Sequence, residues 1–431
     1  MEGLYSLVSD AVIPPMLKVR YDLEDIRIAD IQQTVWDSFE KSGLASRLTQ
    51  DMSIAVGVGS RGLCQLPEEV KAVIDWFKAQ GTKPFIVPAM GSHGNATGEG
   101  QAILLGALGI TPESMGCPVV SSMETVEVGR YEKYDLPVYM DKNAFLADGV
   151  FVINRVKLHT TFTAKNESGL VKMLTIGLGK QMGASSCHNL GYKYFAEVMP
   201  AMTSIILEKH PKVLGGLAVV ENAYDHPYLL EVVPASRIIE RDAELLELSK
   251  TLMPSLPVKS ADVLIVDRIG KNISGLGADP NITGHFLSEY KSNDVSMYRL
   301  GFLDLTEETH GGASGIGGAD AITQRLHQKI DYEATYANVI TSTNIRAGNT
   351  PLVLSSDELL LKVLIKSSCA AGRPLRMIRI RDTLSLSRLM VSPALIQELE
   401  QDARCAIVSS PAPLLFDEQG NLTDMNSWWN F

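Results

Sequence analysis

Short runs of apolar residues recur along the first half of the chain, and each run ends in a cluster of Gly, Ser, Arg, His, Lys, Glu or Asn. The four clearest runs are 53–58, 84–90, 149–153 and 215–220. They are apolar throughout instead of alternating with polar residues, as expected of parallel strands that are buried on both faces. The pattern therefore predicts a mostly parallel sheet.

An amphipathic helix is predicted between the first two runs. Pro67 suits the first turn, Glu69 suits the positive end of the helix dipole, and Gly81 follows the end. Apolar residues that we interpret as core recur at helical spacing: Val70, Val73, Ile74, Trp76 and Phe77. Strands that alternate with helices predict an open α/β sheet, in which ligands bind beyond the carboxyl ends of the strands.

A second domain is predicted to begin near residue 259, after a connector that contains Pro254 and Pro257. A new apolar run at 261–266 starts it. We therefore expect two α/β domains with mostly parallel sheets, residues 1–258 and residues 259–431, and an active site in the cleft between them.

Later elements are less regular. Strands are predicted at 337–340 and 375–380, a loop at the Gly-rich stretch 310–318, and an irregular tail at 410–431.

Composition narrows the class of function. The chain has 431 residues and a formal net charge of −11, which argues against a general nucleic-acid binder. Five cysteines without a C-x-x-C pair favour a reducing, cytoplasmic location, and no apolar run is long enough to span a membrane. A small anionic substrate remains compatible, because one local basic site is enough to bind it.

Two histidines follow predicted strands. His93 lies between glycines, where it is either a surface turn residue or a proton carrier. His159 ends a segment that also holds Arg155 and Lys157, and we interpret the three potential cations as an anion site. A purely structural role for His159, bonded to a neighbouring hydroxyl, is the alternative.

Lys172 lies within an apolar run, between Val171 and Met173. Such a lysine either extends its amine to solvent or is desolvated, and a desolvated amine has a lowered pKa and becomes nucleophilic. His188 follows beside Cys187 and is by itself a weak metal signal.

Two glycine-rich stretches, 177–180 and 311–318, match neither the Walker pattern nor the G-x-G-x-x-G fingerprint. This argues against a P-loop kinase and against an ordinary NAD enzyme.

Together these residues resemble the lactate racemase family that depends on a nickel-pincer nucleotide. The resemblance is carried by Arg61 after a strand, by Gly91-Ser92-His93, by Lys157-Leu158-His159, by Ser168-Gly169-Leu170-Val171-Lys172, and by His188 sixteen residues after the lysine.

The resemblance implies a role for each residue. Lys172 would hold the nucleotide covalently, His188 would ligate nickel, and Ser60, Ser168 and Gly169 would contact the cofactor. His93 and His159 would act as acid and base on opposite faces of a 2-hydroxy acid, while Arg61 would bind its negative charge. The implied activity is that of an isomerase, a racemase or epimerase that inverts C2 by reversible hydride transfer.

One lysine of the family pattern is missing after Asp279-Pro280-Asn281, and Lys271 is taken to replace it as a catalytic residue. This departure favours a substrate larger and more polar than lactate, such as the aldonate gluconate. The polar residues expected to bind it are Asn154, Asn166, Glu221, Asn222, Asp225 and Asn281. Cofactor-synthesis proteins are the expected partners, with a homo-oligomer as a further option and no nucleic acid or membrane.

Two other functions stay open at this point. One is a sugar-acid dehydratase or lyase without nickel, and the other is a non-enzymatic protein that binds an anion or a nucleotide. A nucleotide attached to Lys172 would distinguish the nickel-dependent isomerase from both of these alternatives.

Overall fold

The computed structural model describes residues 2–60, 65–370 and 372–431. The chain forms two compact units. The central unit is Asp25–Met253, and the terminal unit combines Met1–Glu24 with Pro254–Phe431.

The assignment of the first residues to an N-terminal domain of residues 1–258 needs correction. The strand β1 (Leu17–Tyr21) pairs with β14 (Arg388–Val391) and β15 (Cys405–Ile407), both antiparallel, and so completes the sheet of the terminal unit. Short-range patterns could not predict this pairing, because the partners lie at opposite ends of the chain.

The central unit contains the expected parallel sheet, with strand order β3-β2-β6-β7-β8. The first four strands in this order are parallel, and β8 is antiparallel to β7. A separate hairpin joins β4 and β5. The strands are β2 (Ser53–Val58), β3 (Lys83–Pro88), β4 (Thr125–Tyr131), β5 (Leu136–Asp141), β6 (Gly149–Arg155), β7 (Val213–Glu221) and β8 (Pro227–Pro234). The four predicted runs thus all form strands.

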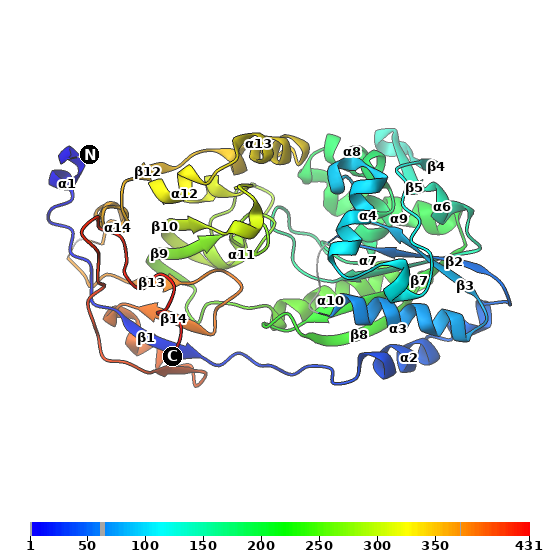
Figure 1. Ribbon diagram of the computed structural model, residues 1–431, viewed down its shortest axis with the longest axis horizontal. Helices are drawn as coiled ribbons and strands as arrows, with labels where there is room; N and C mark the ends of the chain where they lie inside the picture. Colours follow the sequence, from blue (N-terminus) through cyan, green and yellow to red (C-terminus); the bar gives the residue numbers. More distant parts are fainter. Residues whose placement is uncertain (1, 61–64, 371) are drawn as a thin grey trace. The chain divides into compact units, whose positions relative to one another are not determined.

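Helices cover both faces of this sheet, with α2 and α3 on one side and α8 and α9 on the other (Figure 1). The helices are α2 (Ile31–Ser42), α3 (Leu66–Ala79), α4 (Gly98–Ala107), α5 (Pro112–Met115), α6 (Lys142–Leu146), α7 (Leu170–Lys172), α8 (Lys180–Asn189), α9 (Phe195–Lys209) and α10 (Ile238–Leu252). A π-helical turn, Met173–Gly177, separates α7 from α8.

The strands are apolar throughout because each face has its own core. Val150 and Val152 point into the cluster that contains α8 and α9, whereas Phe151 and Ile153 point into the cluster that contains α2 and α3. The predicted stripe of α3, Trp76 included, is fully part of the second cluster. Two buried faces leave only the strand ends for polar chemistry.

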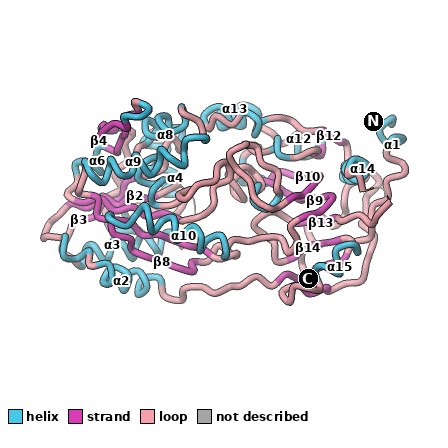
Figure 2. Tube along the Cα trace, turned by 180° about the vertical axis from the view of Figure 1, so that it is seen from behind, coloured by secondary structure: helices cyan, strands magenta, loops and turns pink. Residues whose placement is uncertain are grey.

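The terminal unit has an eight-stranded mixed sheet, with order β12-β11-β10-β9-β13-β14-β1-β15. Its first five strands are parallel. The remaining strands are β9 (Ser260–Ile269), β10 (Ser296–Leu305), β11 (Ala321–Thr323), β12 (Leu352–Leu354) and β13 (Met377–Ile380). Its helices are α1 (Glu2–Leu7), α11 (Pro280–Thr283), α12 (Gln324–Gln328), α13 (Tyr332–Thr341), α14 (Asp357–Ser367) and α15 (Ile396–Leu399). Figure 2 shows β2, β3 and β8 of the central unit close together, with β4 apart from them.

One predicted strand of this unit is wrong. Residues 337–340 belong to α13, which Asp331 caps by accepting a hydrogen bond from the backbone N–H of Ala334. The capping aspartate outweighs the strand preference of the short apolar run. The predicted strands at 261–266 and 375–380 are confirmed by β9 and β13.

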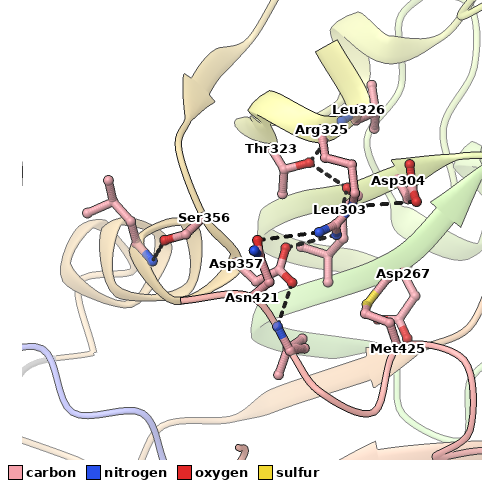
Figure 3. Close-up of polar contacts among 12 residues, drawn as sticks. Asp267, Leu303, Asp304, Thr323, Arg325, Leu326, Ser356, Asp357, Asn421 and Met425 are labelled. Carbon is pink, nitrogen blue, oxygen red and sulfur yellow. Dashed lines mark hydrogen bonds and ion pairs between the residues drawn. The ribbon is translucent and has the colours of Figure 1, made fainter. Parts of the chain in front are cut away.

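The C-terminal tail is irregular, as predicted, yet buried contacts attach it to the terminal unit. Arg325 of α12 pairs with Asp304 and with Asp357, whose other oxygen accepts the N–H of Leu422 (Figure 3). Trp428 donates through Nε1 to the buried Asp267. The tail therefore belongs to the folded core of this unit.

Glu69 lies in the first turn of α3, as predicted, but it faces the core. Its side chain is fully buried, and neither carboxylate oxygen has a hydrogen-bond partner among the described residues. Burial, with the nearby charge of Glu221, raises its pKa to about 8. The neutral acid is therefore the form that the fold favours.

We expect Glu69→Gln to change the pH dependence of stability. Because the folded-state pKa lies above the unfolded value, the folded protein binds the extra proton between about pH 4.5 and pH 8. Wild-type stability should therefore fall as pH rises through this window. The Glu69→Gln variant should lack this decline. Relative to wild type, its free energy of unfolding should therefore rise by about 3 kcal/mol between pH 5 and pH 8.

Urea unfolding at the two pH values measures this difference. Glu68→Gln is the matched control, because Glu68 precedes Glu69 on the same helix and is exposed. Equal pH slopes for the two variants would contradict the burial of a neutral acid at position 69.

Candidate functional site

The carboxyl ends of β2 and β3 bring Ser60 and His93 together. The two strands are parallel neighbours, so the loops that follow them leave the same edge of the sheet. The Ser60 hydroxyl and Nδ1 of His93 form a hydrogen bond. This bond fixes the orientation of the imidazole and leaves Nε2 as the ring nitrogen turned away from Ser60.

The loop that carries His159 is closed on itself after β6. Lys157 and Ser168 exchange two backbone hydrogen bonds of 2.9 and 3.2 Å. Inside the loop, the buried carboxylate of Glu167 accepts the N–H groups of His159 at 2.6 Å and Ala164 at 3.1 Å. Glu167, which the sequence analysis did not single out, therefore holds the backbone of His159 in place.

The ring of His159 is oriented by its own loop. Nδ1 accepts the backbone N–H of Thr161 at 3.1 Å, and the ring packs 4.5 Å from Phe162. Since Nδ1 acts as an acceptor, the neutral ring carries its proton on Nε2.

Gly169 allows the chain to enter α7 close to a buried acid. A Cβ atom at this position would lie 2.1 Å from Oδ1 of Asp242, so a side chain cannot be accommodated. Asp242 accepts the N–H of Leu170 at 2.8 Å, and Asn154 donates to the carbonyl of Gly169 at 2.7 Å. At the start of the helix that carries Lys172, a side chain therefore bonds a backbone N–H and another bonds a backbone carbonyl.

His188 lies in the last turn of α8, against Tyr192 and Phe195, at ring-centroid distances of 5.4 and 5.2 Å. Its Nδ1 is buried without a hydrogen-bond partner among the described residues. Burial and the positive charge of Lys172 lower the pKa of His188 to about 4. The ring is therefore neutral at physiological pH, which is the form that ligates a metal.

Tyr192 connects the two histidine-bearing segments. Its ring lies 6.1 Å from that of His159 and 5.4 Å from that of His188. Burial raises its pKa to about 12, although a hydrogen bond from Thr161 opposes this. The sequence shows Tyr192 shortly after the helix that carries His188, but no pattern in it predicts the contact with His159.

Arg155 does not belong to the anion site that its neighbours suggested. Its guanidinium pairs with Glu221 and, at 3.3 Å, with Asp225, and burial encloses the ion pair. A cation already paired in a buried site is not available to a substrate, because breaking the pair would leave a charge unsolvated.

The remaining predicted residues are placed as follows. Arg61 lies outside the described residues. Lys271 belongs to the terminal unit and follows β9, where its backbone N–H donates to Thr309 at 3.4 Å. Within the described ranges, no group of three or more His, Cys, Asp or Glu side chains could hold a metal ion.

The polar residues expected to favour a sugar acid make contacts inside the protein. Asn154 bonds Gly169, Asn166 bonds Ile239, Asn222 bonds Asp25, Asn281 bonds Asp279, and Glu221 and Asp225 pair with Arg155. Their presence in the sequence therefore gives no support to an aldonate over a smaller 2-hydroxy acid.

Comparison with known proteins gives structural likenesses but no match in sequence. No family model matches the chain, and no curated protein does. The solved structure of the lactate racemase apoprotein from Thermoanaerobacterium thermosaccharolyticum is similar to it, with 14% identity, a TM-score of 0.45, and coverage of 86% of this chain and 99% of that one. At this identity the likeness assigns no activity.

Among the described residues, no helix is both long and apolar enough to cross a membrane.

We expect Lys172→Met to raise the pKa of His188, because it removes the positive charge that disfavours the imidazolium. The pKa should remain below 6.5, since burial is the larger cause of its depression. Imidazole NMR during a pH titration measures the change. His210, whose pKa burial and Lys212 lower, provides an internal reference that should not move. An unchanged pKa of His188 would contradict the proximity of the two side chains.

Proposed function

We propose that this protein is an isomerase, a racemase or epimerase that inverts C2 of a 2-hydroxy acid with a nickel-pincer nucleotide held by Lys172 and His188. The observation that carries the proposal is the state of His188: a half-buried, neutral imidazole whose buried Nδ1 has no hydrogen-bond partner among the described residues, and whose pKa the charge of Lys172 helps to lower. The family resemblance of the sequence motifs supports the same pairing.

The described residues fit such a group. A single imidazole with no further protein ligands suits a metal whose remaining ligands belong to an organic cofactor, and no metal-binding group of side chains competes with it. Lys172 ends α7 immediately before a π-helical turn, a distortion that is frequent at functional sites. Ser168 and Gly169 precede it in the closed loop and would contact the nucleotide, with Ser60 at the neighbouring strand end.

The group, when bound, supplies a reversible hydride acceptor, and the protein supplies proton transfer and binding. His93 follows β3 and His159 follows β6, on either side of β2 in the sheet. Two bases delivered from separate strands suit opposite faces of one substrate carbon. One imidazole, in its neutral form, takes the hydroxyl proton, and the other, in its protonated form, supplies a proton to the same oxygen, so that either configuration at C2 is accessible.

Anionic groups of the substrate require cations. We assign Arg61 to the substrate anion, and Lys271 to the role of the catalytic lysine that the family pattern has and this chain lacks. Short 2-hydroxy acids and aldonates share the chemistry of these contacts, so substrate length is a separate question that assays on both classes answer.

Cofactor attachment is testable by intact mass. Protein made together with cofactor-synthesis proteins should exceed its sequence mass and contain nickel, and Lys172→Ala should return both to background. The matched control is Lys165→Ala, which removes an exposed lysine from the neighbouring loop. Unmodified wild-type protein under these conditions would exclude covalent loading at Lys172.

The roles of the two histidines are tested on loaded protein. His93→Gln and His159→Gln should each lower the rate of C2 inversion by about 10²–10⁴-fold, the usual contribution of a general acid or base, while nickel content stays unchanged. Chromatographic separation of the C2 stereoisomers of lactate and of gluconate measures the activity. Loaded protein that inverts no 2-hydroxy acid would overturn the activity and leave an anion- or nucleotide-binding protein.

A further inference from the structure

A buried lysine stands at the start of the helix that carries His188. Lys180 is completely inaccessible to solvent, and its backbone has a φ of 54°, a left-handed conformation that a lysine seldom adopts. Its amine forms an ion pair with the equally buried Asp141 at 3.2 Å. A buried charge of this kind must be satisfied on all sides, so its other contacts are informative.

The same amine donates to the carbonyl of Pro88, the last residue of β3, and to Oε1 of Gln101 at 3.0 Å. An ammonium group can only donate hydrogen bonds. Lys180 therefore forces the amide of Gln101 to present its oxygen, which turns its NH₂ group the other way.

The NH₂ group of Gln101 donates to two carbonyls of the loop that holds the proposed base: Gly91 at 2.9 Å and His93 at 3.2 Å. The N–H of Gly91 in turn donates to the carbonyl of Gly177 at 3.2 Å, in the π-helical turn. The carbonyls of Gly91 and His93 are thus bonded by one side chain, Gln101, whose orientation Lys180 sets.

We infer that Lys180 is a positioning residue, which acts through Gln101 to hold His93 at a fixed place relative to the Lys172–His188 segment. Lys180 and His188 belong to the same helix, α8. One buried ion pair therefore connects the first turn of the metal-ligand helix with the loop of a base that comes from a different strand. The inference rests on the proposed function for its catalytic meaning, but the connection to His93 can be measured without it.

The ion pair also explains why these charges are tolerated. Burial lowers the pKa of Lys180, and the negative charge of Asp141 opposes this. Asp141 uses its other oxygen to accept the N–H groups of Asn143 and Ala144 at the start of α6. The network therefore joins β3, β5, α4, α6 and α8 at one buried point.

Two variants separate orientation from stability. Lys180→Met with Asp141→Asn removes both charges, leaves no unpaired ion, and retains an oxygen that can cap α6. Gln101→Met keeps the ion pair and removes only the amide that bonds Gly91 and His93. Lys142→Met is the control, because its ion pair with Glu124 is exposed and lies next to Asp141 in sequence.

The first measurement is imidazole NMR of unloaded protein. In the double variant and in Gln101→Met, the His93 signals should shift or broaden as its loop gains freedom, whereas those of His210 should not change. Lys142→Met should match wild type. Unaltered His93 signals in Gln101→Met would overturn the inference, whether or not the double variant folds.

The second measurement is made on loaded protein. For the double variant and for Gln101→Met we expect the nickel content and KM of wild type. Their kcat should be lower by about 10²-fold, the loss that a 1 Å misplacement of a catalytic group can cause. Equal loss of nickel and activity would contradict a role directed at His93. If wild-type protein takes up no cofactor, the proposed function fails, while the NMR result still decides whether Lys180 and Gln101 hold His93.

Discussion

Burial of the central sheet on both faces is the constraint from which the site follows. Strands such as β2 and β6 place successive side chains into two separate cores, which leaves no position along their length for a charged or hydrogen-bonding group. Polar residues can gather only where the strands end. Parallel neighbours end at the same edge, and this is why Ser60, His93 and the His159 loop, although far apart in sequence, leave the sheet on one side.

Protonation in this unit is set mainly by desolvation. Burial keeps His188 neutral, keeps Glu69 protonated, and raises the pKa of Asp242 to about 6. Where a buried group remains charged, a partner accompanies it, as Glu221 accompanies Arg155 and Asp141 accompanies Lys180. A buried group that is neutral can serve chemistry, whereas a buried ion held by an opposite charge serves the fold. Arg155, read from the sequence as part of an anion site, belongs to the second kind.

The sequence predicted what depends on local pattern. The four strands of the central sheet, the α3 stripe and the start of the second sheet at β9 follow from runs of apolar residues and from helix-terminal signals. It failed in two places: one depends on segments far apart in the sequence, and the other on a local helix cap that outweighed an apolar run. Pairing of β1 with β14 and β15 moved the first residues to the terminal unit, and a cap at Asp331 made 337–340 helical. Histidines were found from their position after strands, whereas Glu167, Asp242, Tyr192 and Gln101 act through contacts that no spacing reveals.

Continuity of the chain explains why the loop of His93 needs support that the loop of His159 does not. His159, Lys172 and His188 belong to one segment, whose loop is closed by Glu167 and by the Lys157–Ser168 backbone pair. Their relative placement is therefore fixed by local structure. His93 arrives on a separate strand, through a loop whose backbone includes left-handed turns at Gly91, Gly94 and Asn95. Local structure does not connect this loop to the other segment, so the placement of His93 relative to it must come from a tertiary contact. The path from Lys180 through Gln101 to the carbonyls of Gly91 and His93 is that contact, and the burial of Lys180 and Gln101 excludes water that would otherwise compete for their hydrogen bonds.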